Sequence, residues 1–344
     1  MVTRSQPIAG QLDLNVLGSY LEAHVEGFNR LIDAKKFSDG QSNPTYLISA
    51  DSGQYVLRKQ PSGTLLKSAH AVDREFRVIQ ALQNTEVPVP RALHLCQDRG
   101  VIDGMFFVMS YEAGRIFWDP TLPQLKKPDR TAIYHEMNRV IAALHDVDLE
   151  KIGLQDYGKP GNYFQRQVGR WSRQYRASET DPIVAMDQLI EWLPLNMPAD
   201  DGKVSLIHGD YRIDNIIFDN DRAQAKAIID WELSTLGHPY SDLAYQCMQW
   251  RLDRDAVIPG FGESDRLSLG IPSEQAYVAQ YCDRRGISDI PHWNFYLVFS
   301  FFRFAAILQG VLKRAIDGNA SSRKALDYGA LAPVLAQMAV ALID

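Results

Sequence analysis

The sequence predicts an α+β fold in two lobes, a small antiparallel β lobe with one main helix and a larger, mostly helical lobe. Three observations support this prediction. Up to Ser110, short runs rich in β-branched and aromatic residues are bounded by turn residues, a pattern typical of strands. From Pro128 onward, apolar residues recur mainly at helical intervals. A chain of 344 residues can bury two cores, and we place the lobes at residues 1–110 and 111–344.

In the small lobe, Asp13 is a candidate N-cap for a first helix with Leu14, Leu17, Leu21 and Val25 on its apolar face. The main helix is predicted over Ser68–Gln83, and the prolines that follow it cannot continue a helix. The predicted strands, which form one antiparallel sheet, are Arg30–Phe37, Thr45–Ala50, Gln54–Lys59, Ala92–Cys96 and Met105–Ser110.

In the large lobe, a helix is predicted from Asp129 to His145, and we expect a structural role for the histidine at its end. Helical patterns near the C-terminus cover Ser273–Arg285, Pro291–Ile316 and Ala320–Ile343.

Composition narrows the possible functions. The net charge of −6 argues against a general nucleic-acid binder. Three cysteines, without the spacing of metal ligands, fit a reducing cytoplasm, and the first residues lack the apolar region of a signal peptide. The most apolar window, Phe295–Leu308, is too short to span a bilayer and carries Arg303. We therefore expect a core helix there and no membrane partner.

The stretch from Ser205 to Leu243 is the most informative part of the chain. Two short apolar runs enclose a polar loop, His208-Gly209-Asp210-Tyr211-Arg212-Ile213-Asp214-Asn215, and a third apolar run leads to Asp230. A kinase catalytic loop places its Asp two residues after a His and an Asn five residues later, with a metal-binding Asp on the next strand. His208, Asp210, Asn215 and Asp230 keep this arrangement.

These residue types suit phosphoryl transfer to a hydroxyl group. Asp210 is the candidate that orients the attacking hydroxyl and accepts its proton. Asn215 and Asp230 are candidate ligands for Mg²⁺, because magnesium prefers oxygen donors. Arg212 is a candidate for stabilising charge in the transition state, with a structural role in the loop as the alternative. We expect His208 to pin the loop by hydrogen bonds.

The motif His-Gly-Asp-Tyr-Arg-Ile-Asp-Asn, followed by Ile-Ile-Asp-Trp-Glu, resembles the aminoglycoside phosphotransferase and choline kinase-like family. It resembles more closely the phosphotransferase domain at the N-terminus of some acyl-CoA dehydrogenase proteins. The resemblance extends from about Phe28 to the C-terminal helices. It implies a bilobal protein-kinase-like fold, with a nucleotide-binding lobe before a catalytic and substrate-binding lobe. It also implies that Asp242 supports the backbone of the catalytic loop.

The same resemblance implies the residues that bind ATP. Arg58, in the place of the usual lysine on the third strand, would contact the phosphates, although the neighbouring Lys59 remains an alternative. Glu75 would be the helix carboxylate that pairs with Arg58. The other implied nucleotide contacts are Gly40, Ser42 and Asn43 in a flap over the phosphates, and Ser110, Tyr111 and Glu112 in the hinge.

The acceptor is less defined by the sequence. Arg166, Arg170, Arg173 and Arg176 recur at helical spacing, with Trp171 nearby, so we expect Arg170, Arg173 and Trp171 to meet an anionic acceptor. The alternative is a solvated helix face paired with acids elsewhere. Glu232, after the metal-binding Asp230, is a further candidate for a contact near the metal.

The sequence thus predicts an ATP- and Mg-dependent kinase that phosphorylates a small-molecule hydroxyl, possibly that of a hydroxyacyl-CoA. Alternatives are an aminoglycoside, choline or homoserine kinase, and a nucleotide-binding module without turnover. A protein kinase is disfavoured, because the segment from Asp230 to Gly237 is too short for a peptide-docking loop.

Overall fold

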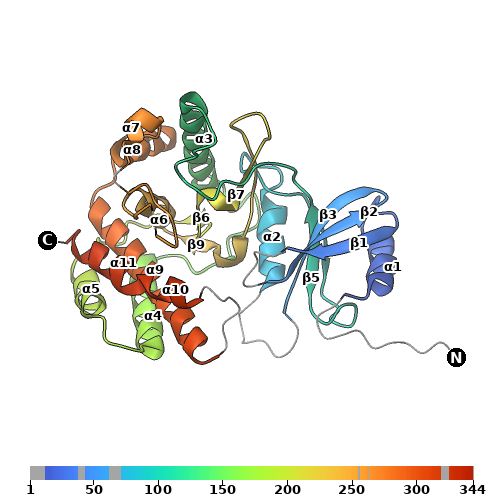
Figure 1. Ribbon diagram of the computed structural model, residues 1–344, viewed down its shortest axis with the longest axis horizontal. Helices are drawn as coiled ribbons and strands as arrows, with labels where there is room; N and C mark the ends of the chain where they lie inside the picture. Colours follow the sequence, from blue (N-terminus) through green and yellow to red (C-terminus); the bar gives the residue numbers. More distant parts are fainter. Residues whose placement is uncertain are drawn as a thin grey trace. The chain divides into compact units, whose positions relative to one another are not determined.

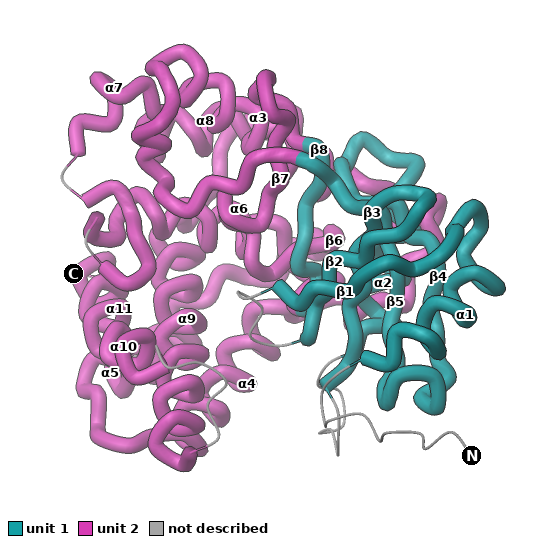
Figure 2. Tube along the Cα trace, turned by 45° about the vertical axis from the view of Figure 1, so that its right-hand side comes forward, with its two compact units in different colours: residues 1–113, 226–232 teal, residues 114–225, 233–344 magenta. Residues whose placement is uncertain are grey.

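The computed structural model describes residues 12–37, 43–61, 71–254, 256–262, 264–318 and 325–343. Within these residues the chain forms two compact units (Figure 2). One comprises residues 1–113 and 226–232, and the other residues 114–225 and 233–344. Lys226–Glu232, which we placed in the second lobe, thus groups with the first. The backbone amide of Ile228 donates to Pro88 O, and Lys226 Nζ donates to Ala113 O, which explains this grouping.

The first unit contains the predicted antiparallel sheet, with strand order β1-β2-β3-β5-β4. A tight turn at Asp51 and Ser52 joins β2 to β3, so that Ala50 pairs with Gly53 and Thr45 with Arg58. The strands are β1 Leu31–Lys36, β2 Thr45–Ala50, β3 Gly53–Lys59, β4 Ala92–Cys96 and β5 Phe106–Ser110. Each differs from its predicted range by no more than one residue at either end.

Helices α1 (Leu14–His24) and α2 (Val72–Leu82) cover opposite faces of this sheet (Figure 1). Asp13 caps α1 by accepting from the backbone amides of Asn15 and Val16, as predicted. Successive side chains of β3 point to opposite faces of the sheet. Leu57 packs in the core beneath α1, whereas Arg58 points to the side of α2.

The second unit is mostly helical, and α9 (Trp293–Ile316) is its most buried long element. Length and hydropathy alone would allow α9 to cross a membrane, but 83% of its most apolar window is buried within the protein. This agrees with the predicted core helix. The other α-helices of this unit are α3 Lys127–His145, α4 Tyr163–Ser178, α5 Val184–Leu195, α6 Tyr240–Cys247, α7 Arg266–Leu269, α8 Glu274–Arg285, α10 Ala325–Gly329 and α11 Leu331–Val340.

The helical pattern at Ala320–Ile343 forms two helices, α10 and α11, where it is described. Pro333 lies in the first turn of α11, where its missing N–H interrupts the preceding helix. Gly329, at the break, packs closely on α9, since a Cβ there would lie 2.5 Å from Leu312 Cβ.

Short strands and 3₁₀ turns near the centre of the sequence position the polar loop. Strand β6 pairs antiparallel with β9, with Leu206 opposite Leu236, and β6 leads directly into the loop. These elements are β6 Ser205–Ile207, η1 Ile213–Asn215, β7 Ile216–Phe218, β8 Ala225–Ile228, η2 Trp231–Leu233, β9 Thr235–Gly237 and η3 Met248–Trp250.

His238, just after β9, is expected to make the stability of the fold sensitive to acid. Its side chain is buried against Tyr296, and Nε2 lies 3.3 Å from Asp201 Oδ1. Burial lowers the pKa of His238 to about 4, from an ordinary value of 6.5. As the pH falls, His238 is therefore protonated in the unfolded chain before it is protonated in the folded protein. The free energy of unfolding should decrease from about pH 6.5 towards pH 4.

Urea titrations across this pH range test the prediction. His238→Gln should reduce the slope of stability against pH, whereas His135→Gln, at an exposed position, should leave it unchanged. A wild-type slope in His238→Gln would mean that another group controls acid unfolding.

Candidate active site

The backbone of the polar loop is fixed by Asp242 on α6. Its Oδ2 accepts from the amide of His208 at 2.6 Å, and its Oδ1 accepts from the amide of Gly209 at 2.9 Å. Burial alone would raise the pKa of Asp242, but His145, His208 and the backbone donors lower it, so the carboxylate stays ionised. His145 lies 3.6 Å from Asp242 and contacts Tyr281 OH, a buried structural position as expected. Asp242 thus supports the loop as predicted.

Gly209 allows the loop to turn between His208 and Asp210. Its φ of 83° lies in the left-handed region, and a Cβ there would lie 2.6 Å from Leu233 O. Any other residue would be both strained and obstructed. His208 is fully buried, and its Nδ1 accepts from the amide of Asp210 at 3.2 Å. This contact agrees with the predicted pinning role.

The carboxylate of Asp210 is held at both oxygens. Tyr245 OH donates to Oδ1 at 2.6 Å, and Asn215 Nδ2 donates to Oδ2 at 3.1 Å and to the main-chain oxygen of Asp210 at 2.9 Å. Burial alone would raise the pKa of Asp210, but the charge of Arg212 and the Tyr245 hydrogen bond lower it. An ionised, oriented carboxylate that remains 25% exposed can receive a substrate hydroxyl.

Asn215 and Arg212 complete the loop in different ways. Because Asn215 uses Nδ2 for both contacts with Asp210, its Oδ1 remains as an oxygen donor for a cation. Arg212 forms a two-pronged ion pair with Asp214, and its Nε lies 3.9 Å from Asp210 Oδ1. This geometry supplies the structural role that we considered as the alternative. Contact of Arg212 with a phosphoryl group stays a prediction.

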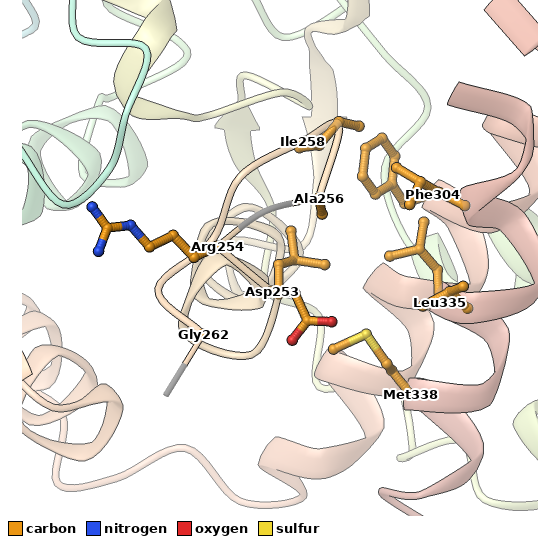
Figure 3. A pocket seen from close by; sticks show the side chains of 11 residues that line it. Asp253, Arg254, Ala256, Ile258, Gly262, Phe304, Leu335 and Met338 are labelled. Atoms are coloured by element: carbon orange, nitrogen blue, oxygen red, sulfur yellow. The ribbon is translucent and has the colours of Figure 1, made fainter. Parts of the chain in front are cut away.

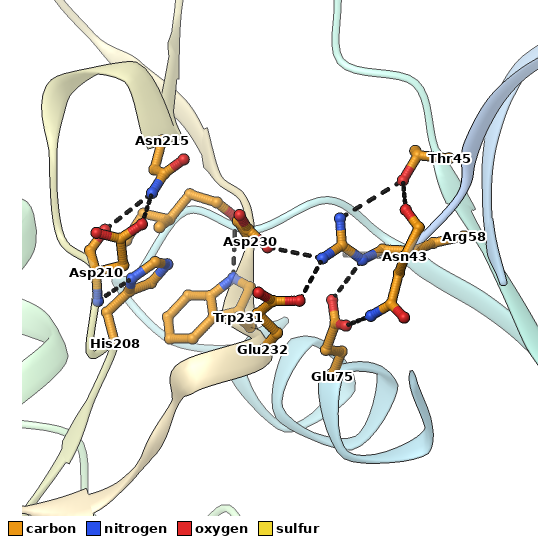
Figure 4. A network of polar contacts seen from close by, with 11 residues as sticks. Asn43, Thr45, Arg58, Glu75, His208, Asp210, Asn215, Asp230, Trp231 and Glu232 are labelled. Atoms are coloured by element: carbon orange, nitrogen blue, oxygen red, sulfur yellow. Dashed lines mark hydrogen bonds and ion pairs between the residues drawn. The ribbon is translucent and has the colours of Figure 1, made fainter. Parts of the chain in front are cut away.

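In the first unit, Arg58 is surrounded by three carboxylates (Figure 4). Nε lies 2.8 Å from Glu75 Oε2, and Nη2 lies 2.7 Å from Asp230 Oδ1 and 3.4 Å from Glu232 Oε2. Burial alone would lower the pKa of Arg58, but these carboxylates raise it, so the guanidinium stays charged. The structure thus brings together the predicted residues Arg58, Glu75 and Asp230.

Asp230 is placed by an unusual backbone turn. It follows β8 with a φ of 67°, a left-handed conformation that Asp tolerates better than most residues. The next residue, Trp231, is buried and donates from Nε1 to Ile228 O at 3.0 Å, which anchors the turn. The side chain of Asp230 remains 36% exposed. The exposed carboxylate of Asp230 is thus a hard oxygen donor of the kind that magnesium prefers.

The remaining nucleotide predictions have different outcomes. Gly40 and Ser42 lie outside the described residues. Asn43 is 1% exposed and donates from Nδ2 to Glu75 Oε1 at 2.9 Å. We had placed Asn43 in a flap, but it orients the carboxylate that pairs with Arg58.

In the predicted hinge, Ser110 Oγ donates to Glu112 Oε1 at 2.6 Å. The carboxylate of Glu112 lies 3.8 Å from Lys226 Nζ, and Tyr111 is 38% exposed. Contact of these three residues with a nucleotide stays a prediction.

The arginines of α4 do not form one uniform stripe. Arg166 donates to Lys159 O and Pro160 O, and Arg176 lies 2.6 Å from Asp187. Arg170 and Arg173 are exposed and are the guanidinium groups best placed for an anion.

Trp171 was predicted to meet the acceptor, but its side chain is only 6% exposed. The guanidinium carbon of Arg170 lies 5.1 Å from the centroid of the Trp171 ring, and that of Arg303 lies 5.7 Å from it. Trp171 therefore serves as a packing platform for two cations, not as an exposed acceptor surface.

Two side chains in contact with the loop were not predicted, Tyr245 and Arg303. Arg303 Nη2 donates to Gly209 O at 2.7 Å. Both had a signal in the sequence. Tyr245 lies three residues after Asp242, on the same face of α6. Arg303 is a cation in the apolar middle of α9, well before the basic last turn of that helix, which indicates a buried partner.

Arg58 and Lys59, the two candidates for the phosphate contact, lie in different surroundings. Lys59 lies on the other face of β3, is 5% exposed, and donates from Nζ to Ile102 O at 2.9 Å. Neither residue is a solvated cation at a strand end. Arg58→Ala should raise the nucleotide KM about tenfold or more and lower kcat, because hydrogen bonds to charged groups contribute about 1.5–3 kcal/mol.

Lys59→Met, which keeps the buried stem, is the matched control. Its nucleotide KM should stay near that of the wild type, with a loss only in melting temperature. The opposite ranking in steady-state kinetics would assign the phosphate contact to Lys59.

Comparison with known proteins identifies the family of the chain. The model of the phosphotransferase enzyme family matches residues 33–277. A crystal structure of a putative aminoglycoside phosphotransferase from Ralstonia eutropha is 46% identical, with a TM-score of 0.88 over 96% of this chain and 98% of that one. Aminoglycoside phosphotransferase APH(4)-Ia, at 16% identity and a TM-score of 0.64, covers 95% of this chain and 98% of its own, and shares the fold.

Curated relatives extend the comparison. Acyl-CoA dehydrogenase family member 10 from Mus musculus is 50% identical over 305 residues, which are 88% of this chain and 28% of that protein. Probable acyl-CoA dehydrogenase IBR3 from Arabidopsis thaliana is 43% identical over 366 residues, 100% of this chain and 44% of that protein. The chain thus spans less than half the length of these relatives. The predicted resemblance and the kinase-like α+β fold are confirmed, and the chain belongs to the phosphotransferase enzyme family.

Proposed function

We propose that this protein is an ATP- and Mg²⁺-dependent kinase that phosphorylates the hydroxyl group of a small molecule. The observation that carries the proposal is Asp210, an ionised carboxylate held at both oxygens in a loop whose backbone Asp242 supports. Asp210 orients the acceptor hydroxyl and takes its proton. Arg58, oriented by Glu75, binds the nucleotide phosphates.

Asn215 Oδ1 would supply one ligand to magnesium, and the Asp230 carboxylate another. Magnesium, when bound, neutralises charge on the phosphates. We also propose that the protein works in the cytoplasm, since Cys96, Cys247 and Cys282 are buried free thiols.

The acceptor that we propose is anionic, most specifically a hydroxyacyl-CoA. Two relatives over 40% identical are named as acyl-CoA dehydrogenases, so an acyl thioester is a reasonable common ligand. Arg170 and Arg173 are exposed cations on α4 that suit the phosphates of coenzyme A. An aminoglycoside or choline acceptor would instead need acidic or aromatic groups for its positive charge.

An apolar cavity in the second unit is a candidate site for the acyl group of such an acceptor. Residues of the segment that follows η3, of α9 and of α11 line this cavity (Figure 3). Its volume is about 480 Å³. Phe304, Leu335 and Met338 form much of its apolar lining, while Asp253 and Arg254 are the charged residues among those that line it. The ring of Phe304 also packs edge-on against Tyr245 at 5.8 Å, one side chain away from Asp210. An aliphatic chain in this cavity would therefore lie behind the residues that hold the catalytic loop.

A transfer assay tests the function. The protein is incubated with Mg²⁺ and isotopic ATP, together with hydroxyacyl-CoA thioesters of increasing chain length, the free hydroxy acids, kanamycin, choline, homoserine and a generic peptide. We expect phosphorylated hydroxyacyl-CoA, with a KM that falls as the chain lengthens. Efficient phosphorylation of kanamycin or choline alone would overturn the acceptor class. Tight ATP binding with no transfer to any acceptor would favour the module without turnover.

The exposed arginines of α4 give a more specific prediction. Arg170→Ala and Arg173→Ala should each raise the KM for a hydroxyacyl-CoA about two- to fivefold at low salt, the range expected for exposed ion pairs. The effect should shrink as salt rises, because salt screens exposed charges. Arg176→Ala is the control on the same helix, since Arg176 is already paired with Asp187. Equal KM values for all three variants and the wild type would exclude an acceptor anion at this face.

A further inference from the structure

Tyr245, on α6, is one of the two side chains that hold the Asp210 carboxylate. Its hydroxyl donates to Asp210 Oδ1 at 2.6 Å, the shortest of the hydrogen bonds described at this carboxylate. The side chain is only 5% exposed. A Phe side chain would fill the same space. The hydroxyl of this buried Tyr, which is directed at the carboxylate of the catalytic loop, therefore has a role beyond packing.

The ring of Tyr245 is fixed from two sides by α9. The guanidinium carbon of Arg303 lies 5.3 Å from its centroid, and Phe304 packs edge-on at 5.8 Å. Arg303 also donates to Gly209 O at 2.7 Å and lies over Trp171. Tyr245 thus has little freedom to rotate, and the group that restrains its ring also binds the residue before Asp210.

Two donors therefore determine the rotation of the Asp210 carboxylate, Tyr245 at Oδ1 and Asn215 at Oδ2. A carboxylate oxygen has two acceptor sites, so each oxygen keeps one for an incoming hydroxyl. Without Tyr245, Oδ1 would lose its described donor and the carboxylate could turn about the Cβ–Cγ bond. Small errors in the position of a reacting group reduce rates steeply.

We propose that Tyr245 is a positioning residue for phosphoryl transfer, which acts by holding the Asp210 carboxylate in the orientation that receives the acceptor hydroxyl. This inference rests on the proposed role of Asp210. It differs from a role in stability, because it requires that Tyr245 act only through Asp210.

A double-mutant cycle tests that requirement. Tyr245→Phe should lower kcat for transfer to 3-hydroxybutyryl-CoA at least about tenfold, a loss in the range of small misplacements, with little change in the affinity for ATP. In the Asp210→Asn background, the same substitution should change kcat less than about twofold. Equal losses in both backgrounds, or no loss in the first, would overturn the proposal.

Tyr134→Phe separates this effect from lost stability. Tyr134 is fully buried and its hydroxyl donates to Pro120 O at 2.6 Å, so the change removes a bond of equal length away from the loop. It should lower the melting temperature about as much as Tyr245→Phe, with kcat retained.

If the wild type phosphorylates no hydroxyacyl-CoA, the acceptor proposal fails. The cycle is then measured on ATP hydrolysis, where water takes the place of the hydroxyl. The same coupling between Tyr245 and Asp210 is expected, and its absence there would also overturn the inference.

Discussion

Replacing Asp210 by Asn is expected to lower kcat by about 10²–10⁴-fold, the usual contribution of a general base. The amide keeps the size of the side chain and can still accept from Tyr245, so the loop should remain folded. Nucleotide affinity should be nearly unchanged, because Asp210 acts only once the hydroxyl is in place. Steady-state kinetics with ATP and the best acceptor, with calorimetric titration of ATP, measure both quantities.

Asp221→Asn is a suitable control for Asp210→Asn. Asp221 is an exposed acid in the turn between β7 and β8, close in sequence but not among the predicted site residues. Its kcat should match the wild type. Turnover near the wild-type rate in Asp210→Asn would refute the kinase assignment of this loop.

Asp230→Ala is expected to abolish the part of nucleotide affinity that depends on magnesium. The wild type should bind ATP more tightly with Mg²⁺ than without it, whereas the variant should bind equally in both conditions. Arg58 also loses its contact at 2.7 Å, but Glu75 and Glu232 still hold the guanidinium. Calorimetric titration with ATP, with and without Mg²⁺, gives the comparison.

The backbone at Asp230 requires a second variant. A φ of 67° is strained for Ala but acceptable for Asn, so Asp230→Asn removes the charge with less strain. Both variants should lose the magnesium effect, and only Asp230→Ala should lose much stability. Retention of the full magnesium effect in Asp230→Asn would remove this residue from the set of metal ligands.

The sequence predicted those strands, helices and caps that are determined by residues close together in the chain. The five strands, the cap at Asp13 and the long helix α9 follow from residue periodicity and capping chemistry, which act within a few neighbours. The interval from His208 to Asn215 was also informative, since a loop of fixed length between two strands brings its own residues together. Asp242 was predicted only through the family resemblance.

The errors lie where distant residues meet. Asn43 donates to Glu75 on α2, 32 residues away, and the polar loop before Pro44 carries no sign of that partner. Trp171 was read as an acceptor contact, because the helical spacing of α4 does not show which face α9 covers. Periodicity identifies which face of a helix is apolar, but it does not identify the element that packs against that face.

By itself, the sequence determined the fold class, the catalytic motif and the identity of the candidate acids, because these depend on short intervals along the chain. Only the tertiary structure decided what holds those acids. Tyr245, which donates to Asp210 Oδ1, lies 35 residues later in the chain, and Arg303, which donates to Gly209 O, lies 94 residues later. Arg58 and Asp230 form an ion pair although 172 residues separate them. Such contacts form only when packing brings separate elements together, and no local pattern specifies which polar side chains then meet.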